Sequence, residues 1–204
     1  MSEIWKRKTG KSGQFTTYDI EKKTKVLLIQ PKTKAVVVDY EGCGIIDRLW
    51  MTFPGWFWQH WNTKFPVDQT ILKKLIIRIF WDDEKFPSVE CPAGDFFGIG
   101  HCLYKHYTSK YLAMSSGGFT CYFPMPFKKR VRIEIENIHE TLPVDVFLNA
   151  NYTEYEYLED SRYFHCQYMQ GTSNGYDKIM LLSAEGPGHY SGCALSMQGK
   201  EKSK

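Results

Sequence analysis

The sequence predicts an all-β protein, an antiparallel β-sandwich formed by a single domain with little helix. About ten short runs of apolar, β-branched and aromatic residues follow one another along the chain. Clusters of Gly, Pro, Asn and Asp separate these runs at frequent intervals, as turns do between strands. No long stretch repeats with helical period, and 204 residues suffice for one substantial core.

We expect the sandwich to occupy residues 15–197. Residues 1–14 are rich in Lys, Ser and Gly and predict a flexible amino-terminal segment, whereas residues 198–204 form a polar, lysine-rich tail. The first strands are predicted at 25–30, which Pro31 ends, at 35–40 and at 45–53.

Strict alternation in the third strand assigns its side chains to two faces. One face would carry Ile46, Arg48, Trp50 and Thr52, and the other Ile45, Asp47, Leu49, Met51 and Phe53. Because charge then appears on both faces near its start, we expect this strand to enter the sheet from an exposed edge.

Residues 68–81 fit two patterns, because their apolar positions also match a helical stripe. Residues 75–81 are nearly all β-branched or aromatic, which favours a strand from about Lys74, preceded by a helical turn. The acidic turn at 82–84 is most simply a solvated turn, because its three side chains fall short of the six to eight oxygens that Ca²⁺ needs.

The next stretch, residues 81–101, contains two prolines and three glycines and predicts a shaped loop poor in strand. Two interpretations of its centre are open. Asp95 could accept hydrogen bonds from neighbouring amides in a buried corner while Phe96 and Phe97 fill the core. Alternatively, Asp95 faces a ligand.

The rest of the chain again predicts strands. Residues 104–118 are a loop with one short strand, and further strands are expected at 119–127, 130–137, 144–157, 163–169, 177–183 and 189–197. Within 130–137 the apolar positions alternate with charged ones, so Glu134 and Glu136 are expected on a solvent face.

Three indoles, Trp56, Trp58 and Trp61, lie close together after Pro54-Gly55. Exposed indoles are costly unless something covers them, and Trp favours places with one apolar and one wet side. An interface with another subunit or domain is the leading interpretation, with a sugar-stacking platform and ordinary core as the alternatives.

Composition excludes several classes of function. A net charge of +3 with scattered basic residues argues against a nucleic-acid partner, and no apolar run approaches membrane-spanning length. The amino terminus lacks the apolar core of a signal peptide, so the chain as written is expected to be cytoplasmic. Aromatic residues make up 16% of the chain, which suits both a β core and a sugar ligand.

No metal site or cofactor is predicted. The six cysteines are widely spread without a Cys-x-x-Cys pair, and their disulfide state is left open. His101 and His106 are the nearest to a ligand pair, yet no further ligand accompanies them at a useful spacing. Nucleophile elbows and glycine-rich phosphate loops are absent from the sequence as well.

Five groups of motifs, in order, carry a resemblance that spans nearly the whole chain. They are Tyr-Glu-Gly-Cys-Gly-Ile-Ile at 40–46 with Leu-Trp-Met-Thr at 49–52, Pro-Ser-Val-Glu-Cys-Pro-Ala-Gly-Asp-Phe-Phe-Gly-Ile-Gly-His at 87–101 after Ile-Phe-Trp-Asp at 79–82, Tyr-Phe-Pro-Met-Pro-Phe at 122–127, Tyr-Phe-His at 163–165, and Gly-Pro-Gly-His-Tyr-Ser-Gly at 186–192. In these the chain resembles glycoside hydrolase family 172, which is associated with α-fructofuranosidase and α-arabinofuranosidase activities.

The resemblance implies a jelly roll, followed in the family by a second sandwich, with trimers or larger rings and active sites near subunit boundaries. It also implies a carbohydrate partner containing fructose or arabinose, and a homo-oligomer or a complementary carboxyl-terminal domain. From their place in or beside the motifs, we expect Trp50, Asp95 and His101 to line a concave substrate-binding surface.

The family's catalytic glutamates lie in Gly-Glu and Thr-Glu-Asp-Tyr type motifs after the Gly-His-Tyr segment, and neither motif occurs in residues 1–204. No catalytic residue is therefore assigned, and whether the chain is an enzyme is left open. We expect an amino-terminal jelly-roll half of a hydrolase, truncated or part of a split pair, that is inactive alone. A non-catalytic carbohydrate-binding or self-assembling structural jelly roll is the alternative.

Overall fold

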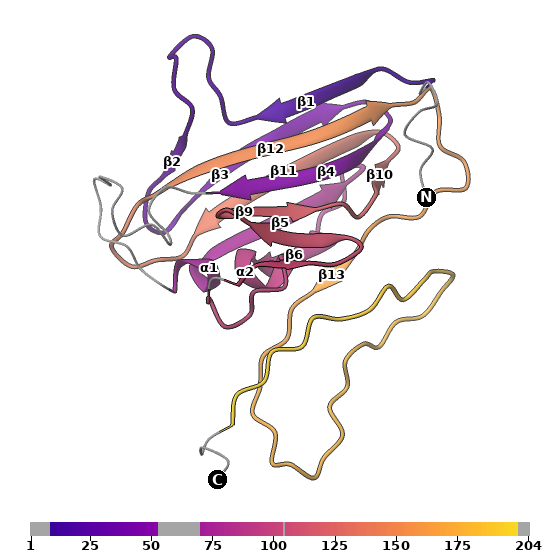
Figure 1. The fold of residues 1–204 in the computed structure, drawn as a ribbon. Coiled ribbons are helices and arrows are strands. Elements are labelled where there is room, and N and C mark those ends of the chain that lie inside the picture. Colours follow the sequence, from indigo (N-terminus) through magenta and orange to yellow (C-terminus); the bar gives the residue numbers. More distant parts are fainter. Residues whose placement is uncertain (1–8, 53–69, 104, 200–204) are drawn as a thin grey trace.

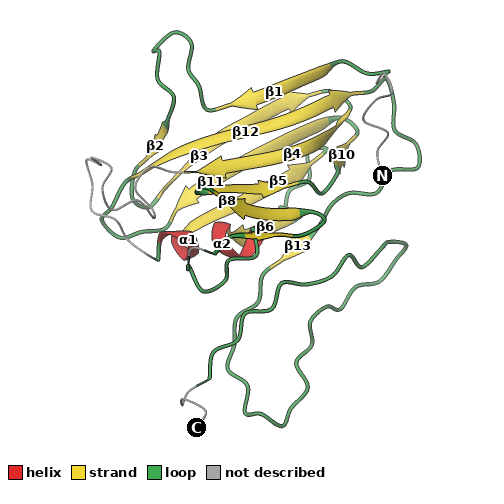
Figure 2. Cartoon of the chain, viewed as in Figure 1, coloured by secondary structure: helices red, strands yellow, loops and turns green. Residues whose placement is uncertain are grey.

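The computed structural model describes residues 9–52, 70–103 and 105–199, and its strands form two sheets (Figures 1 and 2). The eight-stranded sheet has the order β1-β12-β4-β9-β8-β7, with β10 beside β4 and β2 beside β12. Its strands are β1 (Ser12–Thr16), β2 (Leu27–Ile29), β4 (Gly44–Thr52), β7 (Tyr107–Thr108), β8 (Leu112–Ser115), β9 (Gly118–Cys121), β10 (Met125–Phe127) and β12 (Val144–Glu154).

The five-stranded sheet has the order β13-β6-β5-β11-β3 and is antiparallel except where β13 runs parallel to β6. Its strands are β3 (Thr33–Glu41), β5 (Leu75–Trp81), β6 (Val89–Pro92), β11 (Arg130–Asn137) and β13 (Cys166–Gln167). Two single-turn helices, α1 (Ile71–Lys74) and α2 (Ala93–Phe96), flank it. With 42% strand and 5% helix, the all-β sandwich predicted from the sequence is confirmed.

The core lies between the two sheets and follows the alternation of the long strands. In β11 the buried side chains are Val131, Ile133 and Ile135, and in β12 they include Val146 and Leu148. Each removes most of its apolar surface from water, which is worth about 1.5–3 kcal/mol per side chain. The predicted helical turn before the strand at 75–81 is α1, so both parts of that prediction are confirmed.

Strict alternation is wrong for β4. Both Ile46 and Leu49 are fully buried, although an odd spacing separates them. The register against β12 shifts at this point, with Asn151 opposite Arg48 and Tyr152 opposite Ile46. A β-bulge at Asp47 therefore exchanges the two faces, and the residues after it point opposite to the expected way.

The bulge at Asp47 is held by a hydrogen bond across the ladder, in which Thr153 Oγ1 donates to Asp47 Oδ2 at 2.6 Å. Beyond the bulge, Leu49 and Met51 enter the core. Trp50 and Thr52 are only partly buried and lie on the outer face of the sheet.

Glu134 corrects the expectation of a solvent-exposed carboxylate. It lies on the outer face of the five-stranded sheet as the alternation requires, yet it is only 1% exposed. Lys34 Nζ and Arg132 Nη1 donate to its two oxygens at 3.0 and 2.6 Å, and their side chains help to cover it. A carboxylate buried in this way is tolerated because it is doubly paired.

The stretch at 81–101 is more regular than the predicted loop, because it contains β6 and α2. Phe96 and Phe97 are buried, with ring centroids 4.9 Å apart in an edge-to-face arrangement, which confirms that the pair fills the core. Gly94 is needed for the packing of α2 on α1, since a Cβ there would lie 2.9 Å from Leu72 Cβ.

The carboxyl-terminal part differs most from expectation. The strand predicted at 163–169 is reduced to β13, and those predicted at 177–183 and 189–197 are not formed. From residue 168 to 199 the chain has no helix or strand and extends away from the sheets (Figure 1). A strand is stabilised by hydrogen bonds to a neighbouring strand, and no strand of the described chain pairs with these residues. At the other end, β1 begins at Ser12, within the segment expected to be flexible.

Asp82 is a partly buried junction, whereas Asp83 and Glu84 are exposed, as expected of a solvated turn. Its Oδ1 accepts hydrogen bonds from the backbone N–H groups of Lys128, Lys129 and Arg130 at 2.9, 2.7 and 3.2 Å. The hydroxyl of Tyr163 donates to Oδ2. Burial alone would raise the pKa of Asp82, but these hydrogen bonds outweigh it and hold the pKa below its ordinary value.

We expect Asp82→Asn to lower the free energy of unfolding by about 2 kcal/mol, because charge-assisted hydrogen bonds to a partly buried carboxylate are lost. Asn tolerates the left-handed backbone at this position, where φ is 50°. The matched control is Asp83→Asn, also left-handed with φ 65° but 60% exposed at its side chain, which should cost much less. Urea unfolding measures both, and equal losses would contradict the junction role.

The comparison of wild type with Asp82→Asn also predicts how stability depends on pH. Since the pKa of Asp82 is lowered on folding, its stabilisation is fully present above the pKa of the unfolded state, about 3.9, and is lost as pH falls through the folded pKa. The stability difference between wild type and Asp82→Asn should therefore be constant from pH 7 to 5 and shrink toward pH 3. A difference that grows on acidification would contradict the assignment.

Candidate functional site

The carboxylate of Asp95 lies at a corner where α1 and α2 meet. Lys73 of α1 donates to both oxygens of Asp95, at 2.7 and 2.6 Å, and its Nζ lies 3.4 Å from the hydroxyl of Tyr168 and 5.0 Å from that ring's centroid. Burial lowers the pKa of Lys73, but the hydrogen bond to the Asp95 carboxylate more than offsets this and raises it. Asp95 is thus held by a lysine and not by the neighbouring amides that the sequence suggested.

Two thiols lie beside this ion pair. Cys91 of β6 and Cys166 of β13 are free cysteines on adjacent strands. A hydrogen bond between them, together with burial, raises the pKa of Cys91. The same hydrogen bond lowers the pKa of Cys166, against the opposing effect of burial. The extended segment also returns here, because Ser196 packs on Gly100, where a Cβ would also come within 3.1 Å of Asp95 Oδ1.

The corner is therefore assembled from α1, α2, β6, β13 and the carboxyl-terminal segment. Its chemistry is that of a fixed anionic acceptor with adjacent hydroxyl and ammonium donors, a combination able to orient sugar hydroxyl groups. Glycoside hydrolysis usually needs two carboxyl groups, roughly 5 Å or 6.5–9.5 Å apart. The described contacts of Asp95 supply a lysine in place of a second carboxyl group.

Trp50 occupies a different surface. It lies on the outer face of the eight-stranded sheet, with Thr120 and Asn149 as its cross-strand neighbours. Gly118 makes room for the indole, since a Cβ there would lie 2.5 Å from Trp50 Nε1. An indole beside short polar side chains offers a ligand both an apolar face and an N–H donor.

His101 is exposed in the turn after α2, next to Gly100 and so close in the chain to the Asp95 corner. Asp95 and His101 thus share one loop, whereas Trp50 belongs to the other sheet. That all three line one concave surface stays a prediction. Trp56, Trp58 and Trp61, expected at an interface, lie outside the described residues.

The described part of the chain contains no group of three or more His, Cys, Asp or Glu residues placed to hold a metal ion. No helix within that part has the length and hydropathy needed to cross a bilayer.

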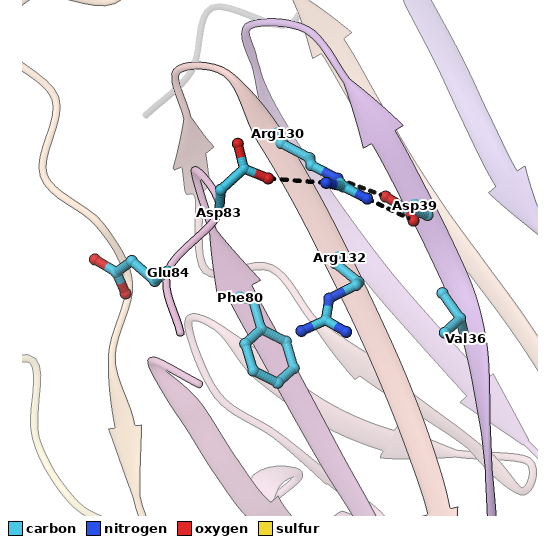
Figure 3. Close-up of a pocket in the computed structure, with 7 residues that line it drawn as sticks. All are labelled: Val36, Asp39, Phe80, Asp83, Glu84, Arg130 and Arg132. Carbon is cyan, nitrogen blue, oxygen red and sulfur yellow. Dashed lines mark hydrogen bonds and ion pairs between the residues drawn. The ribbon is translucent and has the colours of Figure 1, made fainter. Parts of the chain in front are cut away.

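A pocket of about 330 Å³ opens on the outer face of the five-stranded sheet, away from the core (Figure 3). It is lined by Val36, Asp39, Phe80, Asp83, Glu84, Arg130 and Arg132. Neither these residues nor Lys73 was predicted from the sequence to form a site. The available signal was charge at alternating positions of predicted strands, which is usually a solvated face and identifies no partner.

The fold defines an all-β sandwich protein, with an ion pair at the polar corner around Asp95. Residues 19–143 match the family model described as GH172 domain-like, which is more than half of the chain. The chain therefore belongs to this glycoside hydrolase-related family, and the resemblance seen in the motifs is confirmed. No curated protein matches the chain.

The residues matched by the family model include only part of the Asp95 corner. Lys73, Asp95 and Cys91 lie inside the matched region, whereas Cys166, Tyr168 and Ser196 lie beyond it. The ion pair is thus built within the matched domain, and its cover is supplied by the segment that follows.

We expect Lys73→Met and Asp95→Asn to be energetically coupled by about 1–2 kcal/mol in a double-mutant cycle, because each single change leaves a partly buried partner unpaired. Urea unfolding of the wild type, both single variants and the double variant measures this coupling. The exposed pair Lys22–Asp19 is the control and should show no measurable coupling. Additive effects at Lys73 and Asp95 would show that the carboxylate is positioned by other groups.

Proposed function

We propose that this chain supplies the amino-terminal jelly-roll part of a glycoside hydrolase acting on α-linked fructofuranosides or arabinofuranosides. The observation that carries this is the match to the GH172 domain-like family over 19–143, together with the ordered Asp95 corner built from that region's motif. The corner would hold sugar hydroxyl groups, with His101 beside it, while the catalytic carboxylates come from elsewhere.

The proposal includes inactivity of residues 1–204 on their own. A hydrolase of this type needs a positioned carboxyl pair, and general acid–base help alone is commonly worth 10²–10⁴-fold in rate. Asp95 is ion-paired to Lys73, and the family's glutamate motifs do not occur in these residues.

The exposed segment after β13 supports a complementary carboxyl-terminal sandwich as the partner. Residues 177–183 have a strand-like sequence, yet Ile179, Met180, Leu181 and Leu182 are 59, 66, 49 and 42% exposed. Strands and apolar side chains in this state are suited to pairing with another sheet. A homo-oligomer would cover them as well, and the two are distinguished by the mass of the purified chain with and without the complementary part.

We expect purified chain to show no turnover of aryl α-arabinofuranoside or aryl α-fructofuranoside. Activity should appear when a second chain carrying the family's carboxyl-terminal sandwich is added. It should disappear when a glutamate of that second chain is changed to Gln. Turnover by residues 1–204 alone, abolished by changing a carboxylate within them, would overturn the proposal.

A non-catalytic carbohydrate-binding module is the second candidate, favoured by Trp50 on an open sheet face beside Asn149 and Thr120. Sugar binding without turnover, even in the presence of the complementary sandwich, would select it.

A further inference from the structure

The pocket on the five-stranded sheet has properties that the Asp95 corner does not explain. It lies over β3, β5 and β11, and the turn after β5 closes one side. Figure 3 shows the guanidinium of Arg132 between Phe80 and Val36, with Asp39 and Asp83 on either side of Arg130. Its volume of about 330 Å³ is at the small end of the range for ligand sites, enough for a single small molecule.

The polar groups of the pocket are held in fixed positions by one another. Arg130 donates through Nε and Nη2 to both oxygens of Asp39, at 2.7 and 2.8 Å, and through Nη1 to Asp83 at 2.8 Å. Arg132 Cζ lies 4.0 Å from the centroid of the Phe80 ring, and Nη1 donates to the buried Glu134. Such planar, paired groups lose little entropy when they bind a ligand.

These ion pairs do not use all the hydrogen-bonding groups of Arg132 and Asp83. Arg132 donates through Nη1 alone among the described residues, and its Nε and Nη2 N–H groups have no acceptor in that part of the chain. The second oxygen of Asp83 accepts no hydrogen bond from the described chain. The pocket thus presents fixed donors and fixed acceptors side by side.

The charges of the lining select the ligand class. Two guanidiniums lie beside the carboxylates of Asp39 and Asp83, whereas the carboxylate of Glu84 is turned away and accepts from the Ser88 hydroxyl at 2.9 Å (Figure 3). An anion therefore meets two negative groups, and a cation meets two arginines. A neutral molecule with several hydroxyl groups can donate to the carboxylates and accept from Arg132 without breaking an ion pair. Val36, which is 51% exposed, offers apolar contact for its C–H groups.

We propose that this pocket binds a neutral polyol, a single sugar unit, as a non-catalytic site separate from the Asp95 corner. The site would hold a glycan against the outer face of the five-stranded sheet. It goes beyond the hydrolase role proposed above, because it needs neither the complementary sandwich nor a carboxyl pair.

The test fills the pocket without breaking its ion pairs. Val36→Trp places a bulky side chain at an exposed position of β3, where aromatic residues are well tolerated. The matched control is Leu28→Trp, at an exposed position of β2 outside the pocket and 44% exposed. Ligand-observed NMR titration of the full chain with methyl α-arabinofuranoside, methyl α-fructofuranoside and inorganic phosphate measures the affinities.

In the Asp95→Asn background, which removes the contribution of the corner, we expect at least one of the two glycosides to bind. Leu28→Trp should leave that binding unchanged, and Val36→Trp should weaken it at least about tenfold. Arg132→Lys keeps the charge but loses the planar fork, and it should also weaken binding. Phosphate should bind more weakly than the glycoside.

Three results would overturn the proposal: Val36→Trp that leaves binding in the Asp95→Asn background unchanged, glycoside binding abolished by Asp95→Asn alone, or no glycoside binding at all. Turnover measured with the complementary sandwich is a separate experiment. A negative result in the binding titration therefore does not contradict the proposed hydrolase role. Likewise, a negative result in the turnover assay does not contradict the proposed sugar site in the pocket.

Discussion

The carboxylate of Asp82 is the constraint on which the ends of the five-stranded sheet depend. It joins the turn after β5 to the turn before β11 through three backbone amides, and it reaches the carboxyl-terminal part through Tyr163. Next to Tyr163, the carbonyl of Phe164 accepts a hydrogen bond from Trp81 Nε1 at 2.8 Å. This places the chain to run beside β6 as β13. The left-handed backbone at Asp82 and Asp83 is tolerated because these contacts compensate for its cost.

The position of β13 in turn completes the Asp95 corner. Once Cys166 lies beside β6, with its N–H donating to the carbonyl of Ser88 at 3.1 Å, Tyr168 is brought over Lys73. The ion pair of Lys73 and Asp95 is then shielded on one side by an aromatic ring, and shielding strengthens a charge pair relative to open solvent. A polar site is thus connected to a turn at the other end of β5 by covalent and hydrogen-bonded links.

Two irregularities shape the outer faces of the sandwich, where Trp50 and the pocket at Arg132 lie. The bulge at Asp47 turns Trp50 outward. A second register shift, between Ile133 and Glu134 against β3, accompanies the burial of Glu134 beneath Lys34 and Arg132. The buried carboxylate fixes one end of Arg132, and Phe80 supports its plane. The core follows a simple alternation, and the candidate binding surfaces lie where that alternation breaks.

The sequence by itself determined the all-β class, the strand from Leu75 after a helical turn, and the core role of Phe96 and Phe97. Each of these follows from local composition and spacing, because the pattern of apolar residues decides which side chains are buried between the sheets. Motifs around Asp95 also identified the family. Tertiary structure alone decided the faces of Trp50 and Glu134, because a bulge or a covering cation depends on the partner strand. It likewise decided the pairing of Asp95 with Lys73 and the roles of Asp82 and Arg132. Residues 177–183 and 189–197 carry strand-like patterns, but a strand forms only where another strand accepts its hydrogen bonds, and the described chain offers none there.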